Sequence, residues 1–262
     1  MLEDFEPGRA GRPRPAWLIT HPDDYEDFDL GRLKAGKEAE VFLVERIASD
    51  GRSCVLAHKR YRPREASRGQ LETLGFEGSS RFVNDHAYRQ TRRFPNTRDQ
   101  RAATKMTTYG RRLLARQWPD HEFATLERLW TAGVNVPLPV ERTADGLLMQ
   151  YVGDGDQAAP RLAQARLGGE EAVEAARQLV ADLHRMVAAG FVHGDLSAYN
   201  LLWWEGRTWI IDLPQCVEIA SHPDALQLLF RDVETVAGWF RSRRIAFDPG
   251  EVYAELLGSC LG

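Results

Sequence analysis

The chain has 262 residues, of which 43% are hydrophobic and 27% charged, with a formal net charge of −4, and this composition is ordinary for a soluble globular protein. No apolar run reaches the length of a membrane-spanning helix, and the acidic N-terminus lacks the apolar core of a secretory signal. The three cysteines lie far apart without disulfide or metal-site spacing, so we expect a cytoplasmic protein in a reducing compartment with no membrane partner.

The first predicted elements are an arm and a pair of strands. Residues 1–28 contain several prolines and glycines, which predicts a flexible N-terminal arm. A loop at Gly36 precedes two β-rich runs, 40–45 and 54–57, and the turn signal Asp50-Gly51 lies between them. This order predicts a hairpin behind a glycine-containing loop.

A long basic insertion is predicted next, at about residues 62–112. This stretch is polar, rich in arginine and broken by glycines. Residues 60–116 hold 14 Lys or Arg and 5 Asp or Glu, so they carry +9 while the rest of the chain carries −13. One segment therefore produces a concentrated positive field within an acidic protein.

The rest of the chain alternates between helices and short strands. A helix is expected from Pro119, at its first position, to Gly133, and a strand pair surrounds Asp145-Gly146. The clearest helix, 170–189, has an apolar stripe that includes Val173 and Leu179. Strands at 201–204 and 208–211 precede closing helices at 223–241 and 249–257.

A β-rich first half followed by a helical second half predicts an α+β fold with two lobes and a cleft between them. The expected division is an arm at 1–28, a β-rich N-lobe at 29–152 that includes the insertion, and a small helical C-lobe at 153–262.

The strongest chemical signal is a polar set between residues 193 and 212. Asp195 and Asn200 follow the long predicted helix, and Asp212 ends the second strand of the next hairpin. Phosphotransferases of the kinase type use one Asp to orient or deprotonate the attacking hydroxyl, while an Asn and a second Asp hold Mg²⁺ on the ATP phosphates. A capping Asp and two surface turn residues would explain each residue alone, but they explain the combined arrangement poorly.

Lys59 ends the strand of the predicted hairpin, where a lysine reaches nucleotide phosphates if a carboxylate holds it. Glu122 shares a helix face with apolar residues, so it is the favoured partner, and Glu127 is the weaker alternative. The loop 36–41 allows close approach of the backbone to phosphates. The connector 148–152 offers backbone groups to an adenine, although a buried strand explains it equally well.

These residues resemble the RIO family of atypical serine/threonine protein kinases, in its prokaryotic-type form, over residues 30–262. The resemblance rests on Gly36-Lys-Glu-Ala, Ala57-His-Lys59, His193-Gly-Asp-Leu-Ser-Ala-Tyr-Asn200 and Ile210-Ile-Asp-Leu-Pro-Gln215. It implies a bilobal protein-kinase-like fold that lacks an activation loop and a peptide-binding subdomain. It also implies ATP with Mg²⁺, or Mn²⁺ in its place, and serine/threonine kinase or ATPase activity on a protein substrate or on the chain itself.

The resemblance also assigns roles to residues. Asp195 is expected to be catalytic, Asn200 and Asp212 to bind the metal, and Asp212 also to be catalytic as an acceptor of phosphate during ATP hydrolysis. The expected ATP-binding residues are Gly36, Lys37, Glu38, Ala39, Val41, Ala57, Lys59, Glu122, Met149, Tyr151 and Leu202.

Three questions stay open at the level of the sequence. A small-molecule phosphotransferase of the aminoglycoside or choline kinase type also uses His-Gly-Asp and a later Asp, although the short C-terminal tail argues against it. A module in which nucleotide binding switches an RNA- or protein-binding surface is a third candidate. The basic segment 60–116 either contacts RNA or the ribosome, as the family's role in ribosome maturation implies, or forms a solvated flap over the ATP site.

Overall fold

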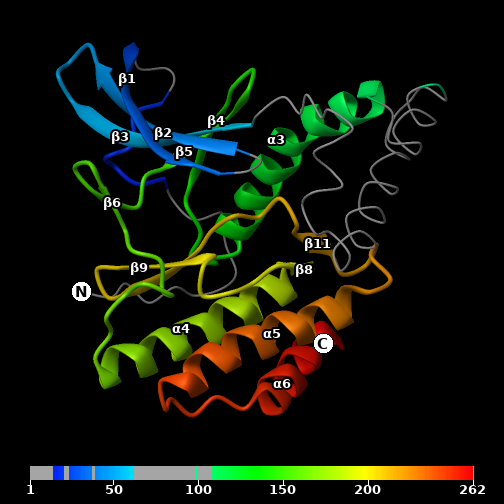
Figure 1. The fold of residues 1–262 in the computed structure, drawn as a ribbon. Helices are drawn as coiled ribbons and strands as arrows, with labels where there is room; N and C mark the ends of the chain where they lie inside the picture. Colours follow the sequence, from blue (N-terminus) through cyan, green and yellow to red (C-terminus); the bar gives the residue numbers. More distant parts are fainter. Residues whose placement is uncertain (1–13, 21–23, 37–38, 62–97, 99–107, 262) are drawn as a thin grey trace.

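The computed structural model describes residues 14–20, 24–36, 39–61, 98 and 108–261. Within these residues the protein is α+β, with a five-stranded antiparallel sheet, four helices and short two-stranded pairings between them. Figure 1 shows the sheet on one side of the molecule and helices α4, α5 and α6 on the other. In the described part of the chain, every helix is too short or too polar to span a bilayer.

Two hairpins of the sheet, β2–β3 and β4–β5, lie at the turns that the sequence predicts. The strand order of the sheet is β1-β2-β3-β5-β4, and every neighbouring pair is antiparallel. The strands are β1 (Tyr25–Ala35), β2 (Ala39–Ala48), β3 (Ser53–Tyr61), β4 (Pro139–Arg142) and β5 (Gly146–Gln150). The predicted strand pair on either side of Asp145-Gly146 corresponds to β4 and β5.

The beginning of the chain differs from the predicted arm. β1 starts at Tyr25, inside the segment 1–28, and Leu18 and Ile19 are buried. The buried guanidinium of Arg46 explains this attachment, because it donates to the Ile19 carbonyl at 3.2 Å and to the Asp27 carboxylate at 2.7 Å. Residues 1–13 and 21–23 lie outside the described residues.

Helix α3 (Thr108–Thr131) also begins earlier than the sequence predicts. Pro119 lies inside the helix rather than at its first position. A proline removes one intrahelical donor, yet the helix continues on both sides of it. The last residues assigned to the basic insertion, 108–112, therefore belong to α3, and residues 62–97 and 99–107 lie outside the described part of the chain.

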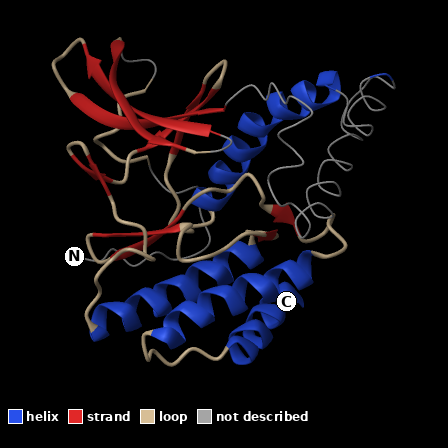
Figure 2. Cartoon of the chain, in the orientation of Figure 1, coloured by secondary structure: helices blue, strands red, loops and turns tan. Residues whose placement is uncertain are grey.

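Short strands and three helices complete the fold. The helices are α4 (Gly169–Ala188), α5 (Ala225–Ser242) and α6 (Pro249–Leu261), and α6 packs against both others. The short strands pair as β6 (Gly153–Asp154) with β7 (Gln157–Ala158), β8 (Phe191–Val192) with β11 (Val217–Glu218), and β9 (Leu201–Trp204) with β10 (Arg207–Ile210). Figure 2 shows the short strands between the large sheet and the helices.

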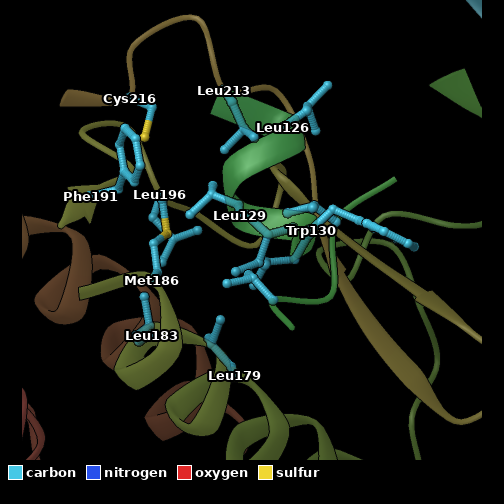
Figure 3. Packing of buried hydrophobic residues seen from close by; sticks show 14 of the residues in the cluster. Leu126, Leu129, Trp130, Leu179, Leu183, Met186, Phe191, Leu196, Leu213 and Cys216 are labelled. Carbon is cyan, nitrogen blue, oxygen red and sulfur yellow. The ribbon is translucent and has the colours of Figure 1, made fainter. Parts of the chain in front are cut away.

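A shared apolar core joins α3 to α4. Leu179, Leu183 and Met186 on α4 point toward Leu129 and Trp130 on α3 (Figure 3). Each fully buried side chain of this size contributes roughly 1.5–3 kcal/mol. The core therefore holds these two helices in place.

Residues from two further segments of the chain are buried in this core. One residue that the sequence predicts to be in the core is exposed instead. Phe191 on β8 and Leu196 in the loop after β8 enter this core, and Leu213 enters from the segment after β10 (Figure 3). Val173, predicted on the apolar stripe of α4, is instead 55% exposed, because the first turns of α4 bury alanines in its place. The core thus fixes the backbone on both sides of the polar set at 193–212.

Candidate nucleotide and metal site

One face of the sheet gathers several residues that the sequence associates with ATP. Lys59 on β3 pairs with Val41 on β2, and Ala57 pairs with Met149 on β5. Residues directly opposite one another on antiparallel strands project to the same face, as do residues two apart on one strand. The register therefore places the side chains of these four residues on one face, with Lys59 toward the C-terminal end of β3.

Lys59 is the residue of this face that contacts two carboxylates. It is buried, and its Nζ atom lies 2.7 Å from Glu122 Oε1 and 3.0 Å from Asp212 Oδ1. Burial alone lowers the pKa of Lys59, but the two carboxylates outweigh burial and raise the pKa above its usual range. The lysine therefore stays charged.

Glu122 reaches the lysine from α3 and is itself buried. Its carboxylate also accepts hydrogen bonds from the Tyr61 hydroxyl and, at 3.3 Å, from the Leu213 amide. A buried carboxylate needs such partners because an uncompensated charge costs several kcal/mol. The structure thus pairs Lys59 with Glu122, the partner favoured by the sequence, while Glu127 is exposed.

Asp212 lies directly after β10 in a left-handed backbone conformation, with φ of 67°. Asp tolerates this region better than most side chains. The turn leaves its side chain 49% exposed while the carboxylate reaches Lys59. Burial raises the pKa of Asp212, but Lys59 outweighs it, so the pKa lies below its usual range and the group remains ionised.

Asn200 connects the two aspartates. Its side-chain amide donates to the Asp195 carbonyl at 2.9 Å and lies 3.5 Å from the Asp195 carboxylate. Its backbone carbonyl accepts from the Ile211 amide at 3.0 Å, one residue before Asp212. The hairpin therefore brings the three predicted polar residues together on one side of β9 and β10.

The loop that carries Asp195 is held by backbone hydrogen bonds. The buried His193 ring donates from Nε2 to the Ile211 carbonyl at 3.1 Å, and its Nδ1 accepts from the Asp195 amide at 3.3 Å, which fixes the orientation of the ring. Asp195 is exposed, yet partial desolvation by neighbouring groups raises the pKa of its carboxyl, and the nearby charge of Asp212 raises it further. His193 and Arg231 oppose this shift.

Sequence reasoning missed Asp232 on α5. It is buried and accepts hydrogen bonds from the Gly194 amide at 2.7 Å and the Leu196 amide at 2.9 Å, on both sides of Asp195. The neighbouring Arg231 donates to the Gly194 carbonyl. A signal was present: Asp232 falls on the apolar face of a predicted helix, where a carboxylate needs partners.

The remaining predicted site residues are distributed as follows. Gly36 forms the turn between β1 and β2, where its amide donates to the Ala39 carbonyl at 2.9 Å and an added Cβ would lie only 2.9 Å from the same oxygen. Tyr151 follows β5 with a buried hydroxyl, and Leu202 is half-buried on β9. Lys37 and Glu38 lie outside the described residues.

The side chains at 200 and 212 fit a hard divalent cation. Since the Asn200 nitrogen is used by Asp195, its oxygen is left as an acceptor, and the Asp212 carboxylate is ionised. No cluster of three or more His, Cys, Asp or Glu suited to a metal occurs among the described residues. Two oxygen ligands match Mg²⁺, which takes one or two protein groups and completes its shell with phosphate oxygens and water.

Comparisons with known proteins show which family the chain resembles. Residues 81–252 match the model of the RIO domain. A RIO-type serine/threonine-protein kinase of Haloferax volcanii is 33% identical over 237 residues, which cover 90% of this chain and 71% of the relative. The mouse serine/threonine-protein kinase RIO3 is 33% identical over 87% of this chain, and a probable RIO1 homologue of Encephalitozoon cuniculi is 28% identical over 88%.

The match to longer relatives is partial, since the chain covers 42% of the mouse protein and 58% of the Encephalitozoon protein. The sequence resemblance is nevertheless confirmed by both the domain match and the identity to the Haloferax kinase. This chain belongs to the RIO domain family.

Proposed function

We propose that the protein is an ATP- and Mg²⁺-dependent phosphotransferase that acts as a serine/threonine protein kinase, an ATPase or both. The observation that carries this proposal is the position of Lys59, whose ammonium group bridges Glu122 on α3 and Asp212 after β10. A charged lysine on a β-sheet, held by a helix glutamate beside an aspartate that can bind metal, is the arrangement that kinases use to position ATP phosphates. The named kinase relatives support the same activity.

The proposed roles follow from geometry and charge. Lys59 binds the phosphates of ATP, and Glu122 keeps the lysine oriented. Asp195, exposed at the front of its loop, orients the attacking hydroxyl or water and accepts its proton, which its raised pKa favours. Asn200 and Asp212 would hold Mg²⁺, which neutralises charge on the phosphates when bound.

Nucleoside binding is proposed for the apolar part of the same face. Ala57 and Met149, paired across β3 and β5, would cover the adenine from the sheet side, and the half-buried Leu202 would support it from β9. Tyr151 lies in the connector after β5, whose backbone is proposed to bind an adenine edge. Gly36 and Ala39 form a tight turn that allows close approach to phosphates.

A bilobal arrangement is part of the proposal. The five-stranded sheet with α3 would form the N-lobe, and the part from β6 to α6 would form the C-lobe. Between Asp212 and α5 the chain has only twelve residues, numbers 213–224, and they include β11. So short a segment supports the absence of an activation loop and of a peptide-binding subdomain.

ATP turnover tests the proposal directly. Wild-type protein with ATP and Mg²⁺ should release phosphate or label a protein serine or threonine, and Asp195→Ala and Asp212→Ala should each abolish most of this activity. Replacing Mg²⁺ by Mn²⁺ tests the metal assignment. Unchanged turnover in both variants would reject the phosphotransfer assignment.

The substrate and partners stay predictions. A protein hydroxyl, including one on the chain itself, is proposed as the acceptor, and a cytoplasmic location supplies both ATP and Mg²⁺.

Small-molecule phosphotransfer is not favoured, because the relatives found are named protein kinases. Contact of residues 60–116 with RNA or the ribosome rests on their charge of +9 alone, and salt-sensitive RNA binding that survives Asp195→Ala would support it.

A further inference from the structure

Arg161 lies beside the proposed nucleotide site, although the motifs that define the site do not include it. It forms an isolated antiparallel bridge with Leu202 on β9. Two hydrogen bonds flank the pair: the Leu162 amide donates to the Leu201 carbonyl at 2.8 Å, and the Trp203 amide donates at 3.0 Å to the carbonyl that precedes Arg161. This pattern defines a non-hydrogen-bonded antiparallel pair, in which the two side chains lie closest together.

Burial shows which way the pair faces. Leu162 and Leu201, the neighbours of the pair, are both fully buried in the core that contacts α4. Because side chains alternate along extended backbone, the half-buried Arg161 and Leu202 point away from that core. Figure 1 shows β9 between α4 and the five-stranded sheet, so this side of β9 faces the sheet that carries Lys59.

The guanidinium of Arg161 has no partner within the described residues. No described side chain or carbonyl forms a hydrogen bond or ion pair with it, in contrast to Arg46, which contacts two carboxylates. A half-buried arginine in this position offers unused donors to an anion.

We propose that Arg161 binds the phosphate chain of ATP from the side opposite Lys59. This inference rests on the proposed function, which places the adenine over Leu202 and the phosphates near Asp212. An arginine that projects beside Leu202, on the side of β9 that faces the sheet with Lys59, lies on the way from the adenine to the phosphates. Its planar group matches phosphate oxygens in a two-point contact.

Binding of two ligands that differ only in phosphates tests the proposal. Isothermal titration calorimetry of the full chain, in the presence of Mg²⁺, would compare the affinity for a non-hydrolysable ATP analogue with the affinity for adenosine. Arg161→Met, which keeps the apolar stem, should weaken binding of the analogue about 10-fold or more, the effect of one charge-assisted hydrogen bond. Adenosine affinity should change less than about 2-fold, and Arg161→Lys should show an intermediate loss for the analogue.

Arg207→Met is the matched control, because Arg207 is an exposed arginine on the neighbouring strand β10. It should leave the affinity for both ligands unchanged. Equal binding of the analogue by wild type and Arg161→Met would overturn the inference while leaving the proposed function intact, and so would an equal loss for analogue and adenosine. Wild-type protein that binds neither ligand would overturn both proposals.

Discussion

Two parts of the candidate site are built in opposite ways. The pair Lys59–Glu122 joins residues 63 positions apart, on β3 and α3, and both side chains are buried. The set Asp195, Asn200 and Asp212 comes from one loop and one hairpin, and both of its carboxylates are exposed. The first part is a buried charge pair, and removal of Glu122 would leave Lys59 with the half-exposed Asp212 as its counter-ion. The second part exposes charged oxygens to ligands and solvent.

The comparison indicates that folding stability and the reaction depend on different parts of the site. A buried ion pair costs several kcal/mol when one partner is removed. The exposed Asp195 carboxylate contributes little to folding, so its removal should affect mainly the reaction, whereas removal of Asp212 also takes a partner from the buried Lys59. Substitutions in the two parts should therefore differ in which quantity they change, and the predictions below test this from the largest expected effect to the smallest.

Asp195→Ala should reduce ATP turnover by about 10²–10⁴-fold, the usual contribution of a positioned proton acceptor. The free energy of unfolding should change by less than about 0.5 kcal/mol, because the side chain is exposed. Steady-state phosphate release and urea unfolding measure the two quantities. Asp156→Ala, at an exposed position in the β6–β7 turn, serves as the control and should alter neither.

Glu122→Ala should lower the free energy of unfolding by about 3–5 kcal/mol, because Lys59 loses its buried partner. Urea unfolding followed by circular dichroism gives this value. Glu127→Ala, at an exposed position on the same helix, should stay within about 0.5 kcal/mol of wild type. If the two variants unfold at the same urea concentration, the buried pair has no special role in stability and the comparison fails.

Asp232→Asn should destabilise the protein by about 1.5–3 kcal/mol, since two amides of the Asp195 loop lose a charged acceptor. Asp232 should affect both stability and turnover, because it is buried like Glu122 and also holds the loop that carries Asp195. Turnover should therefore fall together with stability. Glu234→Gln, exposed on the same helix, should change neither quantity, and a stable Asp232→Asn variant with full turnover would contradict the assignment.

The smallest effect is expected for His58, the neighbour of Lys59 on β3. Burial, aided by Arg60, lowers the pKa of His58 below 6.5, so the folded protein binds a proton less readily than the unfolded chain. Stability should therefore fall as the pH drops through about 6.5, by at most about 1.4 kcal/mol per pH unit. His58→Gln should flatten this slope in thermal unfolding between pH 7.5 and 5.5, and an unchanged slope would rule out His58 as its source.

Prediction from sequence succeeded best where the signals were local. The β9–β10 hairpin needed only the spacing around Glu205-Gly206, and it brings Asn200 and Asp212 together without distant contacts. Helix α4 was bounded to within one residue by its apolar period and the terminal Gly190. The start of α3 was missed because a preference for proline at the first turn does not forbid proline in the interior of a longer helix.

Other features depended on contacts between distant segments. β1 was missed because its exposed, acidic sequence resembles a loop, and only pairing with β2 and the contacts of Arg46 hold it in place. Asp232 and Arg161 belong to no motif in the sequence. The apolar face of a predicted helix marks Asp232 as a carboxylate that needs partners, but those partners appear only once α5 packs against the Asp195 loop. The position of Arg161 appears only once residues 160–162 pair with β9.

The sequence by itself determined the family, the α+β class and the polar set from Asp195 to Asp212, because hairpin turns and helix periods depend on neighbours in the chain. Only the tertiary structure decided that Glu122 rather than Glu127 meets Lys59, and that Asp212 shares the lysine. The physical reason is that burying a charge is favourable only where an opposite charge is already positioned, and that position is set by the packing of α3, β3 and β10 together.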